Sequence, residues 1–345
     1  MVISNKSHAT IRKLIQIVKH GLASCILQLA GFHRICIAIF VFASIVFRLN
    51  AQQEFKEGFA RMQDSTSIYF RIFGEKGDTL IFLHGGPGQN MYGVGPDLVP
   101  LSESFVLIMY DQRGSGNSEI GDTSILTAGR HVEDLEELRK YFSINKMTII
   151  GQSWGAMLAA MYTGKYTNNV KRLLLLSPGP PTRKQFDERF AVFLKIDSAG
   201  QGRVAKLRSQ LLKSENPMAV CAEIHSTNEK LYFADHSLIK KRKGDYCMVT
   251  PEAIHRQAIT ASLTLRSLGQ YDLRPILKLI NQPVLIIEGA KTPVPLSEFY
   301  IWKESLPNSR LIFFDKTGHG YPFVEEAKKF FKTAKKYLKG KWPVN

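Results

Sequence analysis

The chain has 345 residues, of which 44% are hydrophobic and 22% charged, and this composition excludes a disordered chain, a collagen-like repeat and a small disulfide-dense scaffold. Its mean hydropathy of −0.10 also excludes a polytopic membrane protein, because several apolar spans of about 20 residues would make that value strongly positive. The net charge of +16 would suit a nucleic-acid partner, but no zinc-finger, RRM or helix-turn-helix motif accompanies the basic runs, so we expect solvated basic faces and no nucleic acid.

The first segment of the chain, residues 1–51, has the pattern of a targeting segment. It contains no acidic residue, and its apolar run at 35–47 has the length of a secretory signal core but is short for a bilayer span of about 20 residues. Ala51 is a small residue at which a signal peptidase could cut. We expect a cleaved signal peptide or an uncleaved membrane anchor, and hence an exported or membrane-anchored protein. A lipoprotein box at 22–25 is a weaker alternative, and a translation start at Met62 would leave a cytosolic enzyme.

Strand and helix patterns alternate from about Ser65 onward, which is typical of an α/β fold with a mostly parallel sheet and helices on both faces. Short apolar runs predict strands that are buried on both faces, and the first run, whose polarity alternates, predicts a half-exposed strand. The predicted strands lie at 67–74, 78–85, 104–111, 146–153, 170–178, 282–289 and 309–315. Helical spacing of apolar residues predicts helices at 131–142, 154–166 and about 323–338.

The alternation stops over residues 181–271, which are more polar and contain amphipathic helical stretches without a buried-strand run. We expect this insertion to form a helical cap on an α/β core made of 52–180 and 272–345. Cys221 and Cys247 lie in the predicted cap, and in an oxidising compartment we expect them to pair. Without a CxxC motif or a His-rich cluster beside them, they do not predict a zinc site.

The strongest chemical motif is GQSWG at 151–155, a G-x-S-x-G pattern that follows a buried strand and precedes an apolar helix. This is the context of a nucleophile elbow, in which Ser153 sits on a sharp turn and the two glycines leave room for it. The helix that follows directs backbone N–H groups and the positive end of its dipole at the same point. Ser153 is therefore the candidate nucleophile, and an ordinary strand-to-helix turn is the alternative.

A second motif, HGGPG at 84–88, follows the predicted strand at 78–85. Glycines let the backbone approach a ligand closely because they have no Cβ. An N–H group of this loop, together with that of Trp154, would hold the oxyanion of a tetrahedral intermediate. A phosphate-binding turn is the alternative, but neither the GxGxxG nor the P-loop spacing is present.

His319 lies in the glycine-rich segment DKTGHG, between the last predicted strand and the terminal helix. A loop histidine in this place can reach back over the sheet to the Ser153 hydroxyl and act as its general base. This position distinguishes His319 from the other histidines, among which His84 of the HGGPG loop is expected to be structural.

Together with DQRGSGNS at 111–118, these motifs resemble those of the α/β-hydrolase superfamily and, within it, the prolyl iminopeptidase group of serine aminopeptidases. The similarity covers about residues 65–340 and is weakest in the cap. The site residues that it implies are Ser153 as nucleophile, His319 as base, and the amides of Gly86 and Trp154 as the oxyanion hole. It also implies that neither a metal nor an organic cofactor is needed.

One position departs from the pattern of this group. After the strand at 282–289 the group has an aspartate that orients the catalytic histidine, whereas this chain has Thr292. Glu288, Asp315 or a carboxylate from the cap could replace it; otherwise the chain would be a slow Ser–His enzyme or a non-catalytic binding protein. We expect retained hydrolase activity, because the nucleophile, the base and the oxyanion loop are all present.

The sequence therefore predicts a serine hydrolase that cleaves an amide or an ester through an acyl-enzyme, in first place a prolyl iminopeptidase-like aminopeptidase. The expected partner is a small molecule or a short peptide, and the sequence does not determine the oligomeric state. A carboxylesterase or other acyl hydrolase is the alternative, since the predicted cap contains acidic residues but no tryptophan, and a shared fold does not determine the substrate.

Overall fold

The structure, a computed structural model, describes residues 55–343. The chain divides into two compact units, residues 1–58 and 59–345, and the elements described below belong to the second unit except for the start of β1. The predicted signal peptide or anchor at 1–51 lies outside the described residues and stays a prediction. Among the described residues, no helix combines the length and the apolar character that crossing a membrane requires.

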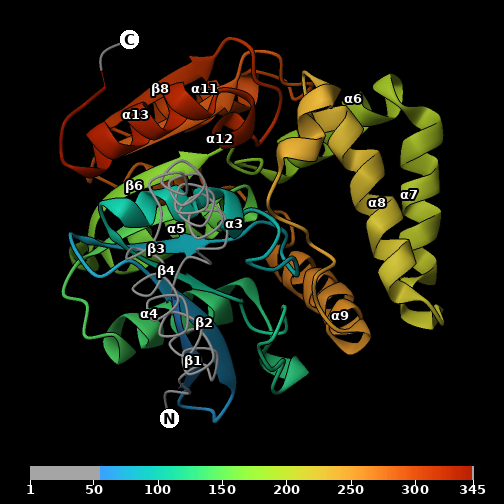
Figure 1. Ribbon diagram of the computed structural model, residues 1–345, viewed down its shortest axis with the longest axis horizontal. Coiled ribbons are helices and arrows are strands. Elements are labelled where there is room, and N and C mark those ends of the chain that lie inside the picture. The colour runs from blue at the N-terminus through green and yellow to red at the C-terminus, as the bar shows by residue number, and fades with distance from the viewer. Residues whose placement is uncertain (1–54, 344–345) are drawn as a thin grey trace, which may run out of the picture. The chain divides into compact units, whose positions relative to one another are not determined.

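One eight-stranded sheet, in the order β1-β2-β4-β3-β5-β6-β7-β8, forms the centre of the described part of the chain (Figure 1). The strands are β1 (Phe55–Arg61), β2 (Ser67–Phe73), β3 (Thr79–Leu83), β4 (Val106–Tyr110), β5 (Met147–Gln152), β6 (Val170–Leu176), β7 (Val284–Gly289) and β8 (Ser309–Phe314). β2 pairs with β4 in the antiparallel sense, and the pairs from β4 through β8 are parallel. The predicted α/β fold with a mostly parallel sheet is confirmed. β1 was not predicted, because Ala60 is the only fully buried residue of the seven and no apolar pattern marks the strand.

Each central strand supplies alternate side chains to two hydrophobic cores, one on either face of the sheet. In β3, Ile81 and Leu83 belong to one core, whereas Leu80 and Phe82 belong to the other. Helices α4 and α5 cover the first core, and α3 and α13 cover the second. Because both faces are covered, these strands appear in the sequence as continuous apolar runs. The helices outside the predicted cap are α3 (Gly95–Leu98), α4 (Ala128–Tyr141), α5 (Trp154–Lys165), α10 (Arg274–Leu277), α11 (Ser297–Ser305), α12 (Pro322–Glu325) and α13 (Ala327–Leu338).

Four longer helices lie between β6 and β7, in the segment for which the sequence predicts a cap, and Figure 1 shows them gathered to the right of the strands. They are α6 (Arg183–Ile196), α7 (Ser198–Gln210), α8 (Pro217–Tyr232) and α9 (Pro251–Leu268). Each begins after a polar residue whose side chain accepts a hydrogen bond from a backbone N–H of the first turn, and proline opens α8 and α9. The capping residues are Thr182, Asp197, Asn216 and Thr250.

A disulfide joins Cys221 of α8 to Cys247, which precedes α9, with the two Cα atoms 5.9 Å apart. The predicted pairing of these cysteines is therefore confirmed. Both residues are buried, and they belong to the core on the α3 and α13 side of the sheet. The bond closes a loop that contains the basic run 238–245 and ties this loop to α8.

The prediction of one terminal helix at about 323–338 is wrong in one respect, because the structure has two helices there, α12 and α13. Glu326 separates the two helices, with φ of −129° and ψ of 47°. Its carboxylate accepts hydrogen bonds from the Lys316 amide and the Thr317 hydroxyl. Apolar spacing does not reveal a helix break that depends on such contacts. Along this segment Phe323, Phe330, Ala334 and Leu338 are buried, and Ala327, just after the break, is only half-buried.

We expect the double variant Cys221→Ser, Cys247→Ser to lose about 3 kcal/mol of unfolding free energy, because the bond closes a loop with a sequence separation of 26 residues and thereby restricts the unfolded chain. Urea unfolding followed by circular dichroism measures the difference. A reductant should lower the stability of the natural chain and leave that of the double variant unchanged. Equal midpoints for the oxidised natural chain and the double variant would contradict the prediction.

Candidate active site

The predicted nucleophile and the predicted oxyanion loop lie side by side because β3 and β5 are neighbours. Leu83, at the end of β3, is opposite Gly151 in β5, so the segments that follow the two strands leave the sheet at the same edge. β3 lies between β4 and β5, so the connection from β3 to β4 and the connection from β4 to β5 cross the sheet in opposite directions. The end of β3 is therefore a topological switch point. Ligands of open α/β sheets bind beyond the carboxyl ends of the strands at such a point.

Ser153 occupies the turn between β5 and α5 in a conformation that is rare for residues with a side chain, with φ of +53° and ψ of −116°. Its neighbours leave no room for larger residues. A Cβ on Gly155 would lie 2.1 Å from the Leu83 carbonyl oxygen, and one on Gly151 would lie 2.5 Å from that of Gly155. The turn is therefore the sharp strand-to-helix bend that the GQSWG motif predicts.

A carboxylate contacts the ring of His319. The Nδ1 atom of His319 lies 3.2 Å from Oε2 and 3.4 Å from Oε1 of Glu288, and both side chains are buried. Glu288 lies near the end of β7, opposite Phe313 of β8, and the loop after β8 carries His319. Glu288 Oε1 also accepts a hydrogen bond from the Gly289 amide.

Of the three carboxylate sources that the sequence left open, the structure brings Glu288 to His319. Asp315 points to solvent, with 82% of its side chain exposed, and pairs with Lys329. Thr292, which stands where the related group has its aspartate, accepts a hydrogen bond from the Val294 amide through its hydroxyl. A glutamate directly at the end of an apolar strand was the signal in the sequence, but it did not distinguish Glu288 from the other candidates.

The loop that carries His319 is attached on two sides. The His319 amide donates a hydrogen bond to the Tyr232 carbonyl oxygen at the end of α8, at 2.7 Å, and the Tyr232 ring lies 5.2 Å from the His319 ring. Glu325 accepts hydrogen bonds from the Gly318 amide and from the amides that follow Tyr232. Glu326 holds the start of the same loop through the contacts described above. The break between α12 and α13 thus serves the placement of His319.

The HGGPG loop is held by a chain of buried hydrogen bonds. His84 accepts one from the Gln112 amide through Nε2, its Nδ1 lies 2.8 Å from the Gly85 carbonyl oxygen, and the Gln112 side chain donates to the His84 carbonyl. The Trp154 indole in turn donates to the Gln112 side-chain oxygen at 2.9 Å. His84 therefore has the structural role predicted for it. The amide of Trp154 is in the first turn of α5, where N–H groups have no acceptor within the helix.

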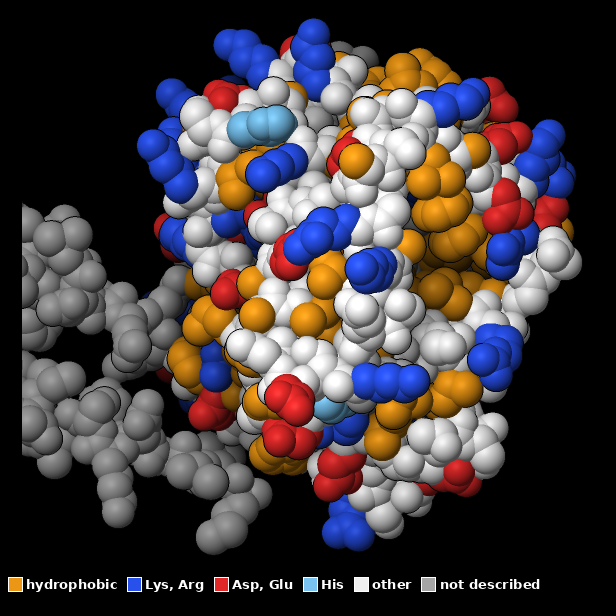
Figure 2. Space-filling model, turned by 90° about the vertical axis from the view of Figure 1, so that its right-hand side faces the viewer, with side chains coloured by type: hydrophobic (Ala, Val, Ile, Leu, Met, Phe, Trp, Pro, Cys, Tyr) orange, Lys and Arg blue, Asp and Glu red, His pale blue; other side chains and the backbone are white. Residues whose placement is uncertain are grey.

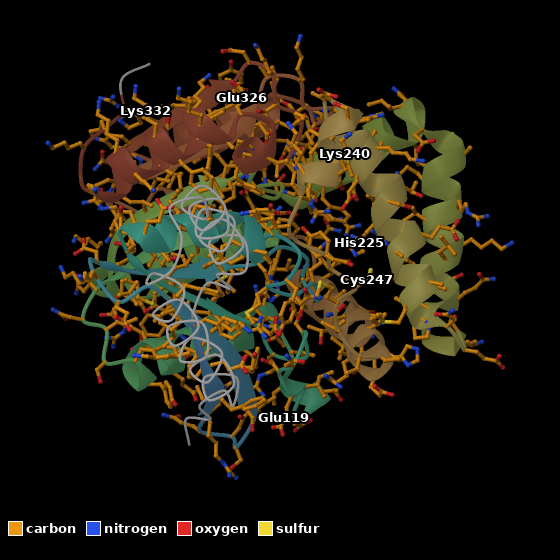
Figure 3. The ribbon with its side chains drawn as sticks, viewed as in Figure 1. Glu119, His225, Lys240, Cys247, Glu326 and Lys332 are labelled. Carbon is orange, nitrogen blue, oxygen red and sulfur yellow. A yellow bond between two sulfur atoms is a disulfide. The ribbon has the colours of Figure 1, made fainter. Side chains whose placement is uncertain are left out.

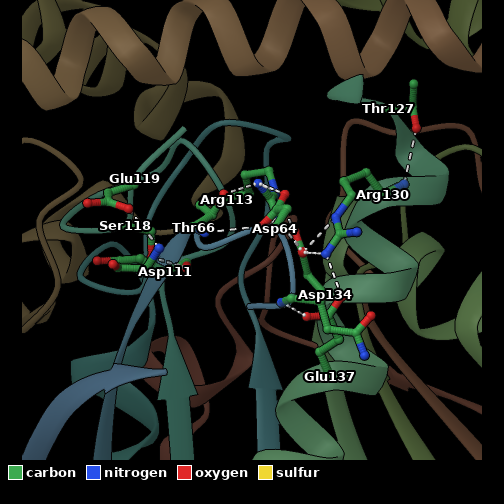
Figure 4. A network of polar contacts seen from close by, with 12 residues as sticks. Asp64, Thr66, Asp111, Arg113, Ser118, Glu119, Thr127, Arg130, Asp134 and Glu137 are labelled. Carbon is green, nitrogen blue, oxygen red and sulfur yellow. Dashed lines mark hydrogen bonds and ion pairs between the residues drawn. The ribbon is translucent and has the colours of Figure 1, made fainter. Parts of the chain in front are cut away.

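The motif at 111–118 anchors this chain of contacts (Figure 4). Arg113, which is completely buried, makes two hydrogen bonds to the Asp134 carboxylate and an ion pair with Asp64. Burial would raise the pKa of Asp64, but hydrogen bonds from Arg113 and Thr66 hold it at about 2. The same segment also contacts the cap, because Arg256 of α9 donates to the Gly116 carbonyl.

A cavity of about 500 Å³ lies over these groups and is lined by Gly86, Ser153, Trp154 and His319. Apolar lining comes mainly from α6 and α9, with Phe186, Phe190, Phe193, Ile254, Ala258 and Leu265. Polar lining comes from α7 and α8, with Gln201, Arg208, His225, Asn228 and Glu229. On the face seen in Figure 2, hydrophobic side chains gather in a hollow that Lys and Arg side chains surround. The size is that of a site for a small ligand.

Two of the charged side chains that line the cavity are already paired. Glu229 forms an ion pair with Arg242, whose guanidinium also lies over the rings of Tyr246 and Tyr321. Arg189 pairs with the buried Glu298 of α11, at 2.5 Å, and so fastens α6 to the core. Glu229 is the one acidic residue in the lining formed by the described residues.

Cys221, His225 and Cys247 have potential ligand atoms within 4.8 Å of one another, and Figure 3 labels His225 and Cys247. The two sulfurs are bonded to each other, so neither is available to a metal in this form. Burial, with the nearby charges of Arg242 and Arg208, lowers the pKa of His225 to about 3. His225 therefore presents a neutral ring to the cavity.

Two further histidines beneath the site are also neutral in the folded chain. Burial lowers the pKa of His84 to about 3 and that of His131 to about 4. The His131 ring packs edge-on against Trp154 at 6.1 Å, and its Nε2 atom lies 3.0 Å from the Thr264 hydroxyl of α9. His131 thus contacts both the turn after Ser153 and helix α9, and it does so uncharged.

Comparison with known proteins gives consistent matches. Residues 78–326 match the family described as alpha/beta hydrolase fold. The chain is 30% identical over 283 residues to the proline iminopeptidase of Lactobacillus delbrueckii subsp. bulgaricus, over 76% of this chain and 90% of that one. It is similar in structure to an esterase from Exiguobacterium antarcticum, with TM-score 0.62, 24% identity and coverage of 82% and 99%. A proline iminopeptidase from Mycobacterium smegmatis matches with TM-score 0.62, 18% identity and coverage of 82% and 97%.

The buried histidines predict a loss of stability in acid. The unfolded chain binds a proton at His131 below about pH 6.5, whereas the folded chain does not until about pH 4, so the unfolding free energy falls as the pH falls through this window. Between pH 7 and pH 4.5 we expect the unfolding free energy of His131→Leu to fall by about 2 kcal/mol less than that of the natural chain. Urea unfolding at each pH measures this, and Thr264→Val, which keeps the buried ring, should retain the natural pH dependence. The prediction would be refuted if the unfolding free energies of the natural chain and of His131→Leu fell by the same amount over this pH range.

Proposed function

Because the chain belongs to the α/β-hydrolase fold family, in its proline iminopeptidase-like group, we propose that it is a serine hydrolase that cleaves an amide or ester bond through an acyl-enzyme. The observation that carries the proposal is the buried contact of His319 with Glu288, in a cavity that Ser153 also lines. A nucleophile, a base and a group that orients the base are the parts that this chemistry requires.

In the proposed reaction, the Ser153 hydroxyl oxygen attacks the carbonyl carbon while Nε2 of His319 takes its proton. Glu288 holds Nδ1 and stabilises the ring when it becomes positively charged, as in other triads. The amides of Gly86 and Trp154 stabilise the oxyanion. The intermediate collapses, the leaving group takes the proton from His319, and a water molecule, deprotonated by the same ring, then releases the acyl group from Ser153.

For the substrate we propose a short peptide with a proline or small N-terminal residue. The support is similarity, since the chain matches proline iminopeptidases over most of its described length. The cavity, which is of small-ligand size, agrees with a short substrate.

A second candidate function, a carboxylesterase or other acyl hydrolase, is favoured by the charge of the cavity. An aminopeptidase must hold a free α-ammonium group, for which an unpaired carboxylate is the natural partner. Glu229, the one acid in the described lining, is already paired with Arg242. An uncharged ester has no such requirement. A third interpretation, a non-catalytic binding protein, rests on Thr292 standing where the related group has an aspartate. The contact of Glu288 with His319 supports catalysis instead, because it supplies a carboxylate.

Chromogenic substrates distinguish these functions. We expect the natural chain to hydrolyse proline p-nitroanilide, or failing that p-nitrophenyl acetate, and to react with a fluorophosphonate probe. Ser153→Ala should lower kcat at least 10³-fold and abolish labelling, because the nucleophile is lost. Equal labelling of the two proteins, or labelling of neither, would refute the serine-hydrolase proposal.

The role of Glu288 is testable in the same assay. In serine-protease triads, replacing the orienting carboxylate by its amide lowers kcat about 10⁴-fold, and we expect Glu288→Gln to lower kcat by about 10³- to 10⁴-fold with KM nearly unchanged. Thr292→Ala is the matched control, because Thr292 does not contact His319, and it should remain active. If Thr292→Ala lost activity and Glu288→Gln did not, the proposal that Glu288 orients His319 would be contradicted.

A further inference from the structure

The cavity contains one cationic side chain with no counterion. Arg208, near the end of α7, lines the cavity and makes no ion pair or side-chain hydrogen bond with any other residue that the structure describes. Arg203, five residues earlier on the same helix, pairs instead with Glu223 of α8. Arg208 is both exposed and cavity-lining, so its side chain is accessible to solvent as well as to the cavity.

The other charges of the lining cancel in pairs. Glu229 is compensated by Arg242, and Arg189 by Glu298. His225, which also lines the cavity, is uncharged because burial and the nearby charges of Arg242 and Arg208 lower its pKa to about 3. Among the charged side chains of the described lining, Arg208 is therefore the one without an ion-pair partner.

Arg208, Tyr232 and His319 line the same cavity. Burial raises the pKa of Tyr232, and Arg189 and Arg208 both oppose that rise, so the two guanidinium groups act on the Tyr232 hydroxyl. The Tyr232 ring lies 5.2 Å from the His319 ring. A molecule that contacts His319 at one end can therefore extend past Tyr232 toward Arg208 within a single cavity.

We propose that Arg208 binds a carboxylate on the substrate, at a distance from the scissile bond. The inference rests on the proposed hydrolase function and narrows its substrate class to molecules that carry a carboxylate. A guanidinium group matches a carboxylate in geometry and holds it with two parallel hydrogen bonds. In a short peptide this group is the C-terminal carboxylate, and in an ester it is a carboxylate on the acyl or the alcohol half.

This subsite selects by charge and by length. A cationic substrate meets like charge at Arg208 and finds no unpaired acid in the described lining. A peptide can place its C-terminal carboxylate in a cavity of about 500 Å³ only if it is short. The proposed substrates are therefore small molecules that carry a carboxylate, and the C-terminal carboxylate of a long polypeptide does not reach Arg208 in this cavity.

Matched pairs of substrates test the proposal and identify which half carries the anion. One pair is prolyl-alanine and prolyl-alaninamide, and the other is p-nitrophenyl hemisuccinate and p-nitrophenyl butanoate. We expect kcat/KM to be about three- to tenfold higher for the member that carries a carboxylate, in at least one of the two pairs. We expect this preference to shrink as salt is added. It should vanish in Arg208→Gln, survive partly in Arg208→Lys and persist in Arg203→Gln. Equal rates within both pairs, or a preference that Arg208→Gln retains, would overturn it.

A binding measurement separates this proposal from the proposed function. If none of the four substrates is turned over, the hydrolase proposal fails, and calorimetry with glutarate and glutaramide still decides the role of Arg208. The natural chain should bind glutarate at least threefold more tightly than glutaramide, and Arg208→Gln should bind the two alike. No preference for glutarate in the natural chain would overturn the anion subsite.

Discussion

The contact between Glu288 and His319 is the constraint on which the arrangement of the site depends. A buried carboxylate needs a partner, and a loop histidine needs an orienting group, so each satisfies a requirement of the other. Because Glu288 lies at the end of β7 and His319 follows β8, the parallel pairing of these two strands brings the groups together. The carboxylate that contacts His319 is thus supplied by a strand and not by the loop that begins at Gly289.

The sequence predicted most of the fold, because apolar runs and helical spacing reflect burial directly. It did not predict β1, in which little is buried, or the break at Glu326, which depends on hydrogen bonds to Lys316 and Thr317. For the site, Ser153, His319 and the HGGPG loop followed from motifs. The choice of Glu288 over Asp315 depended on which carboxylate faces the His319 ring, and residue order along the chain carries no such information.

The cap differs from the core in what determines its chemistry. The core contributes the loops after β3, β5 and β8 to the cavity, whereas helices α6 to α9 contribute most of the rest of its lining. In the described lining, Glu229 and Arg189 each have an ion-pair partner and Arg208 has none. Neither the number of acidic residues nor the absence of tryptophan in the segment shows this balance, since it depends on which charges face each other after folding.

The hydrogen bond from the His319 amide to the Tyr232 carbonyl has a mechanical consequence. The base of the site is attached to the end of a cap helix, and Glu325 reinforces the attachment through Gly318 and Ala234. Any displacement of this end of α8 is therefore transmitted to the loop that carries His319. The position of the imidazole is coupled in this way to the position of a helix that lines the cavity.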